Sequence, residues 1–322
     1  MSLALTTELE RAAKRNLPDP LSASAISVLE HIREGCFQRS LCLIVAATSV
    51  ASGLEVGYEH YKGSYSNPVM YTPVVLSGAL AGSGLLGVFS GTCARTMLRW
   101  VSIATLADGI IGFFFHVRGV ARKPGGWGLP VTNIVMGPPI FAPLLFGTSA
   151  YLGLMASYLR REEDLRKPDE RIRELAAELR PGRPDWRTNL RHGRFQKHLS
   201  ALTIAWAFFS GFEALYSHYK TNFRYKAQWT PVLLTPLLMA AAAGAIKSRR
   251  VAKTALPMVS ALALADGAVG FFYHARGIAR RPGGLKKPLY NAIYGPPIFA
   301  PLLFAACGFL GLMASLLRRE RS

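Results

Sequence analysis

Long apolar runs, separated by short polar and basic segments, dominate the pattern of this chain. A run of about 20 largely apolar residues is long enough to cross a hydrocarbon core of roughly 30 Å as a helix. Such runs begin near Ser40, Tyr71, Leu98, Met136, Leu199, Trp229, Leu256 and Ala292. The pattern therefore predicts an all-α, polytopic membrane protein with about eight transmembrane helices.

Composition agrees with this prediction. Half of the 322 residues are hydrophobic, yet the formal net charge is +19, a combination that apolar spans with basic ends explain. The first span follows about 39 residues that include several arginines and lysines, and no small-residue cleavage site comes after it. We therefore expect it to be a transmembrane helix and not a signal peptide. The four cysteines lack any C-x-x-C spacing and are expected to be packing residues.

The chain contains an internal repeat. Shifting the sequence by 158 residues aligns residues 37–161 with residues 195–319 without a gap, and 58 of the 125 positions are identical. Each copy would hold four spans, so both copies would enter the membrane in the same sense. This predicts two parallel four-helix repeats related by an axis along the membrane normal.

Identity between the copies is uneven. Only 6 of 31 positions agree in residues 63–93, whereas 35 of 55 agree in residues 107–161. Some positions have therefore resisted change while their neighbours drifted. The retained residues of the first copy include Gly53, Glu55, Tyr58, His60, Asp108, Gly109, Gly112, His116, Arg118, Gly119, Arg122, Asn133 and the run Gly137-Pro138-Pro139-Ile140-Phe141-Ala142-Pro143.

The distribution of basic residues predicts the orientation of the chain in the membrane and its division into segments. With both termini cytoplasmic, the inner side carries 26 of the 38 lysines and arginines, which the positive-inside rule favours for a protein of the cell membrane. The expected division is a cytoplasmic N-terminal segment (1–36), the first repeat (37–161), a charged cytoplasmic connector (162–194) and the second repeat (195–319). The connector is either a solvated spacer or a docking segment for a membrane-protein partner. A nucleic-acid partner is not expected, because the charges flank membrane spans and no binding module is present.

Ionisable residues inside the spans are the main functional candidates, since they are costly in lipid. The acids are Glu55, Asp108, Glu213 and Asp266, and the histidines are His60, His116, His218 and His274. Under the predicted topology all eight lie in the outer half of the membrane or near its midplane.

The histidines suggest a ligand site. His60 and His116 each lie two residues before a basic residue, so both are expected at similar depth on parallel helices. A pair facing across the bundle would suit a b-type haem or a divalent metal, with Glu55 and Asp108 deeper as supporting or proton-accepting groups. His218 and His274 would form the second pair. The alternative is structural: the acids pair with arginines or histidines and hold helices together.

The loop after each third span contributes a second candidate site. Arg118, Arg122, Arg276 and Arg280 lie on the predicted outer side, where Glu59 is the one acid beside 12 basic residues. They would bind an anionic headgroup, a quinol oxygen or a carboxylate, or they would neutralise the buried acids beneath them. The adjacent Gly-Gly pair lacks the pattern of a phosphate-binding loop.

The proline-rich run before each fourth span predicts local structure. Gly137-Pro138-Pro139 is expected to begin a helix, and Pro143 and Pro301 are expected to kink the fourth and eighth spans.

Three functions remain open at this stage. The first is metal or haem binding near the outer face through the four histidines. The second is secondary transport with Asp108 and Asp266 carrying the coupling ion. The third is a structural accessory subunit of a membrane complex. No catalytic residue is identified, because no triad, H-E-x-x-H or E-x-x-H arrangement is present.

Overall fold

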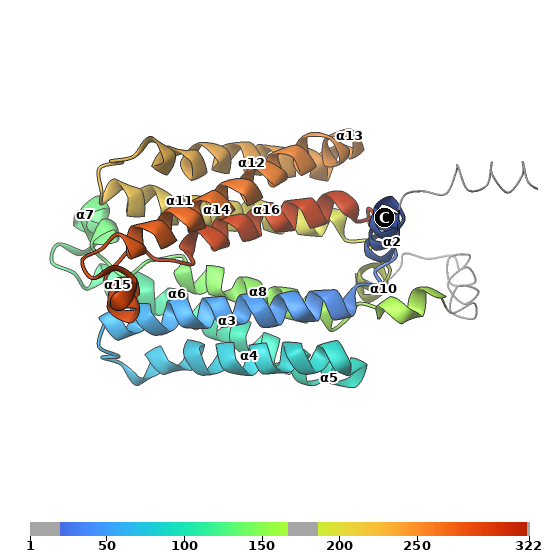
Figure 1. Ribbon diagram of the computed structural model, residues 1–322, viewed down its shortest axis with the longest axis horizontal. Coiled ribbons are helices and arrows are strands. Elements are labelled where there is room, and N and C mark those ends of the chain that lie inside the picture. Colours follow the sequence, from blue (N-terminus) through green and yellow to red (C-terminus); the bar gives the residue numbers. More distant parts are fainter. Residues whose placement is uncertain (1–19, 167–185, 321–322) are drawn as a thin grey trace, which may run out of the picture.

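A computed structural model describes residues 20–166 and 186–320, and these residues form a long bundle of helices (Figure 1). Six helical stretches within this described part are long and apolar enough to cross a membrane. The prediction of an all-helical, membrane-type protein is thus confirmed. The expected docking role of the connector concerns mainly residues 167–185, which lie outside the described residues.

The first half of the bundle runs from α3 to α8. Its helices are α3 (Gln38–Lys62), η1 (Pro68–Tyr71), α4 (Thr72–Phe89), α5 (Gly91–Arg95), α6 (Met97–Ala121), η2 (Gly126–Gly128), α7 (Pro130–Val135) and α8 (Ala142–Ala156). Before it comes α2 (Pro20–Arg33), and after it come η3 (Glu162–Arg166) and α10 (Trp186–Arg191).

The second half runs from α11 to α16. Its helices are α11 (Gln196–Tyr219), η4 (Lys226–Trp229), α12 (Thr230–Lys247), α13 (Arg249–Lys253), α14 (Ala255–Ala279), η5 (Gly284–Lys286), α15 (Pro288–Ile293) and α16 (Ala300–Leu316). Each of these helices begins 158 residues after its counterpart in the first half.

Within the first half, α3 packs on α4 and α8, and α6 packs on the same two helices, so α3 and α6 face each other diagonally. One end of the bundle carries α2 and α10, and we call it the α2 end (Figure 1). The opposite end carries α7 and α15, and we call it the α7 end. Each short helix crosses over, because α7 of the first half packs on α11 and α15 of the second half packs on α3.

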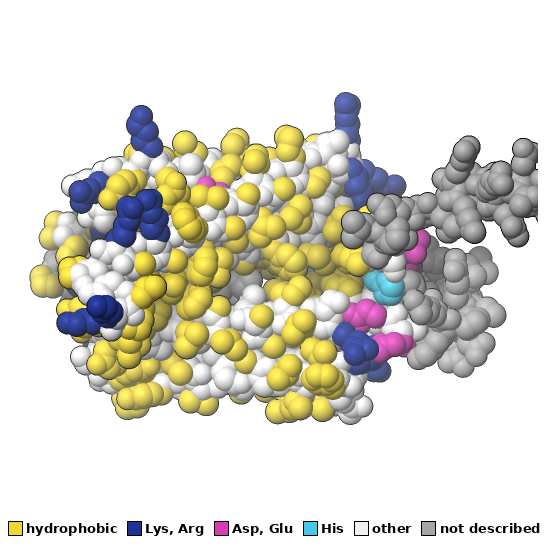
Figure 2. All heavy atoms as spheres, in the orientation of Figure 1, with side chains coloured by type: hydrophobic (Ala, Val, Ile, Leu, Met, Phe, Trp, Pro, Cys, Tyr) yellow, Lys and Arg dark blue, Asp and Glu magenta, His cyan; other side chains and the backbone are white. Residues whose placement is uncertain are grey.

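The side of the bundle is apolar (Figure 2). Large side chains that would normally be buried point outward, with Phe89 75% exposed and Trp100 69% exposed. Lysine and arginine side chains gather at the two ends instead. Outward apolar side chains between charged ends are the arrangement that a lipid bilayer favours.

The fourth helix of each half differs from its prediction. Helices α8 and α16 begin at Ala142 and Ala300, and the preceding Gly-Pro-Pro segment is not helical. Proline has no N–H and disfavours helical backbone in the residue before it, so the paired prolines keep this segment unwound. Pro143 and Pro301 consequently lie in the first turn of their helices, where proline is tolerated. The predictions of a helix start at Gly137 and of kinks at Pro143 and Pro301 were wrong.

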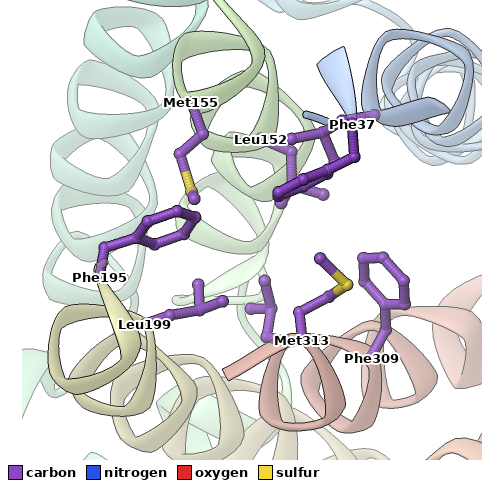
Figure 3. A pocket seen from close by; sticks show the side chains of 9 residues that line it. Phe37, Leu152, Met155, Phe195, Leu199, Phe309 and Met313 are labelled. Carbon is purple, nitrogen blue, oxygen red and sulfur yellow. The ribbon is translucent and has the colours of Figure 1, made fainter. Parts of the chain in front are cut away.

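The cores of the two halves join near the α2 end. Phe37 and Leu152 from one half meet Phe195 and Leu199 from the other, and their side chains point toward one another (Figure 3). The gap between them measures about 10 Å³ and has an entirely apolar lining. Because water needs polar partners to occupy so small a space, this centre is dry.

Two glycines bring the halves together at the α2 end. Gly35 and Gly193 both have positive φ, and a Cβ on Gly35 would lie 2.6 Å from the backbone nitrogen of Gly193. Arg160 N–H donates to the Gly35 carbonyl at 3.0 Å, and Arg318 N–H donates to the Gly193 carbonyl at 2.9 Å. The crossing point therefore admits only residues without a side chain.

A histidine beside this crossing is surrounded by positive charge. Burial, and then the charges of Arg160, Arg194, Arg191 and Arg318, lower the pKa of His192 to about 4. The ordinary histidine pKa is close to 6.5, so on acidification an unfolded chain takes up this proton before the folded chain does. The free energy of unfolding is expected to fall as the pH drops from about 6.5 to about 4.

Replacing His192 by asparagine should flatten this part of the stability curve. Thermal melts of detergent-solubilised wild type and H192N at pH 7, 6, 5 and 4 would measure the difference. H198N, at an exposed histidine, is the matched control and should follow the wild type. If the difference in melting temperature between the wild type and H192N does not change with pH, the lowered pKa of His192 is contradicted.

Candidate functional site

Two half-buried acids connect the halves at the α7 end. Phe299 N–H, just before α16, donates to Glu55 Oε2 on α3 at 2.9 Å. In the equivalent contact with the halves exchanged, Phe141 N–H, just before α8, donates to Glu213 Oε1 on α11 at 2.6 Å. Each carboxylate thus caps the start of the other half's fourth helix, where free N–H groups and the helix dipole favour a negative charge. We call this reciprocal pair of contacts the carboxylate clasp.

Aromatic residues reinforce the clasp. The hydroxyl of Tyr216 donates to the Glu213 carboxylate, and Ile298 N–H donates to the Tyr58 hydroxyl at 3.1 Å. The ring of Phe141 stacks on Phe209 of the other half with 4.7 Å between centroids. The clasp is therefore held by charge, hydrogen bonds and packing at once.

The clasp explains how the non-helical Gly-Pro-Pro segment is stable among apolar helices, where unpaired backbone groups would be costly. Non-helical backbone at membrane depth persists only where its polar groups find partners. The Phe141 N–H has Glu213, and the carbonyl of Pro139 accepts a hydrogen bond from His116 Nδ1–H at 2.5 Å. The same partners recur for Phe299 and for Pro297, which His274 contacts at 2.6 Å.

Glycines on α6 and α14 leave the room in which this segment packs against the two helices. A Cβ on Gly109 would lie 2.7 Å from the Pro143 carbonyl oxygen, and one on Gly119 would lie 2.9 Å from the Pro138 ring. On α14, a Cβ on Gly267 would lie 2.6 Å from the Pro301 carbonyl oxygen. The glycines and the proline run are therefore retained together because they pack against each other.

The other two acids have hydroxyl partners. Thr72 Oγ1 donates to Asp108 Oδ1 at 2.5 Å, and Thr230 Oγ1 donates to Asp266 Oδ1 at 2.5 Å. Both threonines lie at the start of a helix, and both aspartates are half-buried. Among the described residues, no ion pair joins any of the four acids to an arginine or a histidine. The alternative in which arginines neutralise these acids is therefore not supported.

The four histidines share one arrangement. His60 Nδ1–H donates to the Met70 carbonyl at 2.7 Å, and His218 Nδ1–H donates to the Gln228 carbonyl at 2.8 Å. His116 and His274 make the bonds to proline carbonyls described above. A carbonyl only accepts hydrogen bonds, so Nδ1 carries the proton and Nε2 of the neutral ring keeps a lone pair. Within the described part of the chain, none of the four Nε2 atoms has a hydrogen-bond partner.

The histidines lie in pairs. His60 is within electrostatic range of His116 and of Asp108, and His218 is within range of His274. Glu55 and Glu213 are taken up by the clasp and do not join these pairs. In the described residues, no three histidine, cysteine, aspartate or glutamate side chains converge so as to hold a metal ion.

A strained turn places an aromatic ring against one histidine of each pair. Ser64 and Tyr65 both have positive φ (58° and 44°), as do Asn222 and Phe223 in the second half. Non-glycine residues rarely adopt this backbone, and where they do the strain often marks a functional site. The turn stacks Tyr65 on Tyr71 at 4.2 Å and places Tyr65 edge-on to His60 at 6.1 Å. Gly63 and Asn67-Pro68 mark a loop in the first half, but sequence reasoning missed the strained turn because the positive φ falls on Ser64 and Tyr65 and not on the glycine.

The four candidate arginines are exposed at the α7 end. Arg118, Arg122, Arg276 and Arg280 make no ion pair with a described residue. Glu59, the one acid of the predicted outer side, is paired with Lys62 at 2.6 Å. This end is therefore strongly basic and its arginines are available to an anionic ligand (Figure 2).

Comparison with known proteins adds no assignment, since no protein family, curated protein or solved structure matches this chain. The candidate site rests on its own geometry.

Proposed function

We propose that this membrane protein binds haem, one b-type haem held between two imidazoles in each half. The observation that carries the proposal is the shared state of the four histidines. Each donates Nδ1–H to a backbone carbonyl and leaves Nε2 free, which is how histidines that ligate metals are usually oriented. His60 with His116, and His218 with His274, would supply the two axial ligands.

Haem suits these residues better than a divalent ion. Protein sites for zinc use three or four protein ligands, and no such group exists among the described residues. Haem brings four nitrogen ligands of its own and requires only two from the protein. The diagonal placement of α3 and α6 is compatible with the same choice, because both helices pack on α4 and α8 and each therefore turns one face toward the interior of the bundle.

Orientation and span number complete the proposal. Eight crossings are obtained if α8 and α16 are extended by the unwound segment before each of them, since 15 residues of helix cover only about 23 Å. The α2 end would be cytoplasmic and the α7 end extracytoplasmic, as the basic residues of the connector and C-terminus favour. Both haems would then lie in the outer half of the membrane, within two four-helix repeats at residues 37–161 and 195–319.

The absorption spectrum of the purified protein tests the proposal. Protein produced with added haem precursor should show a Soret band, sharp bands on reduction with dithionite, and about two haems per chain by pyridine haemochrome assay. The double variant H60A/H116A should retain about one haem, and adding H218A/H274A should remove both. H31A/H198A, at histidines outside the pairs, is the control and should keep two. Colourless protein after reconstitution, or variants that keep full haem, would exclude the proposal.

Transport is the second candidate, favoured by one observation. Asp108 and Asp266 are half-buried in apolar helices, and among the described residues each has a threonine hydroxyl as its hydrogen-bond donor, so each would be open to a proton or cation. The double variant D108N/D266N separates the two functions. Under the haem proposal it keeps its spectrum. A colourless wild type whose ion flux in vesicles disappears in this variant would favour transport.

A further inference from the structure

The interface between the halves is not symmetric near the α2 end. On one side α8 packs directly on α11, whereas on the other side α16 and α3 barely touch. On the closed side the ring of Tyr151 lies 6.1 Å from the ring of Trp206 and 6.1 Å from that of His198, which is exposed at the edge of the interface. Trp206 also donates its indole N–H to Thr148.

Smaller residues occupy the equivalent positions on the other side. Subtracting or adding the repeat of 158 residues places Phe309 opposite Tyr151, Ser40 opposite His198 and Thr48 opposite Trp206. Two bulky side chains are thus missing between α3 and α16. The fold leaves a space there that it fills in the other copy.

The space is a cleft of about 470 Å³ between α2, α3 and α16. Its apolar walls are Val28, Ile32, Leu41, Ile44, Phe309 and Met313. The volume falls in the range of roughly 300–1,000 Å³ that ligand sites occupy. In Figure 2 the surface is hollowed between the two halves, with hydrophobic side chains on both sides.

The rim of the cleft is polar, and an exposed arginine lies beside it. Glu162 lies at the rim, but its carboxylate already accepts the N–H groups of Arg39 and Ser40 and the Ser40 hydroxyl. Arg33 follows the lining residue Ile32, is exposed, and forms no ion pair with a described residue. Lys253, which donates to the Ser315 carbonyl at 2.7 Å, lies within electrostatic range of Arg33. An exposed arginine beside an apolar cleft is complementary to a phosphate with a hydrocarbon tail.

We propose that this cleft binds one anionic phospholipid, with an acyl chain between α3 and α16 and the phosphate at Arg33. The cleft lies along the first turns of α3 and the last turns of α16, both of which are apolar helices. The surrounding medium at that depth is hydrocarbon, so an acyl chain reaches the cleft more readily than any soluble ligand. The site is independent of the histidine pairs at the α7 end and of the haem proposal.

Photolabelling tests the site. The protein is reconstituted in phosphatidylcholine vesicles that contain phosphatidylglycerol with a diazirine in its acyl chain, irradiated and digested, and the labelled peptides are identified by mass spectrometry. Label on residues 40–48 and 309–313 should exceed label on the equivalent residues 198–206 and 151–155 by about fivefold or more, a difference of roughly 1 kcal/mol. Equal labelling of the two sides would overturn the proposal without any variant.

Variants taken from the closed side sharpen the test. S40H/T48W introduces the two larger side chains that occupy the equivalent positions on the closed side, and label in the cleft should fall about fivefold. L85W, at a half-exposed residue of α4 away from the cleft, should leave the label unchanged. R33Q should reduce the label from phosphatidylglycerol and not that from phosphatidylcholine carrying the same diazirine. Cleft labelling that survives S40H/T48W in protein with a wild-type melting temperature would also overturn the proposal.

Discussion

Replacing Glu55 and Glu213 together by alanine is expected to lower the melting temperature of the detergent-solubilised protein by about 10 °C or more. The double variant breaks both contacts of the carboxylate clasp and leaves the N–H groups of Phe141 and Phe299 without partners. An unsatisfied buried polar group costs about 1–3 kcal/mol, and loss of a charged acceptor adds to this cost. Together the two sites should lose about 3–6 kcal/mol.

The single variants refine this expectation. Glu213 accepts hydrogen bonds from the backbone of both Phe141 and Ala142 and from Tyr216, so E213A should cost more than E55A. E213Q keeps an acceptor oxygen and should recover part of the loss. E163A, at an exposed surface ion pair with Arg39, is the control and should change the melting temperature little. A double variant as stable as E163A would show that the clasp does not hold the halves together.

Replacing Gly109 and Gly267 together by alanine is expected to prevent normal docking of the fourth helices. The new Cβ atoms would lie 2.7 Å from the Pro143 carbonyl oxygen and 2.6 Å from the Pro301 carbonyl oxygen and the Ala305 nitrogen. These are backbone atoms, so the clash cannot be relieved by rotating a side chain. Overpacking of a well-packed core costs about 1–3 kcal/mol for each site, and backbone displacement places these two at the upper end.

Glycines elsewhere in the same fold supply the matched control. Gly78 and Gly82 on α4 have no atom within 4 Å of the position a Cβ would take. G78A/G82A should therefore be neutral or stabilising, since alanine favours a helix by about 0.5–1 kcal/mol over glycine. Thermal melts and the elution volume on size exclusion compare the two double variants. Equal melting temperatures for both would contradict the packing argument.

The clasp also shows where sequence reasoning reached its limit. The sequence marks Glu55 as a functional candidate, because a carboxylate in an apolar span is costly. Its partner, the Phe299 N–H, lies 244 residues away and carries no side-chain signal at all. Reasoning from side chains alone led to arginines and histidines as the expected partners, whereas the real partners are a helix start and a tyrosine hydroxyl.

The start of α8 is a second feature that the local sequence does not determine. The apolar run from Met136 predicts one continuous span, yet the helix begins only at Ala142. The proline run stays unwound because His116 and Glu213 satisfy its backbone, and both residues reach it from other helices. Periodicity within the run could not reveal that support, and it likewise could not reveal the strained turn at Tyr65.

The amino-acid sequence by itself determined that this protein is helical, that its helices are apolar along their length, and that the chain carries one pattern twice. These properties depend on hydrophobicity, helix length and spacing, which are written locally in the chain. Only the tertiary structure decided which groups the buried acids bind, where α8 and α16 begin, and which side of the interface stays open between α3 and α16. Those outcomes depend on contacts between residues from different helices, and the energy of such contacts exists only once the helices have packed.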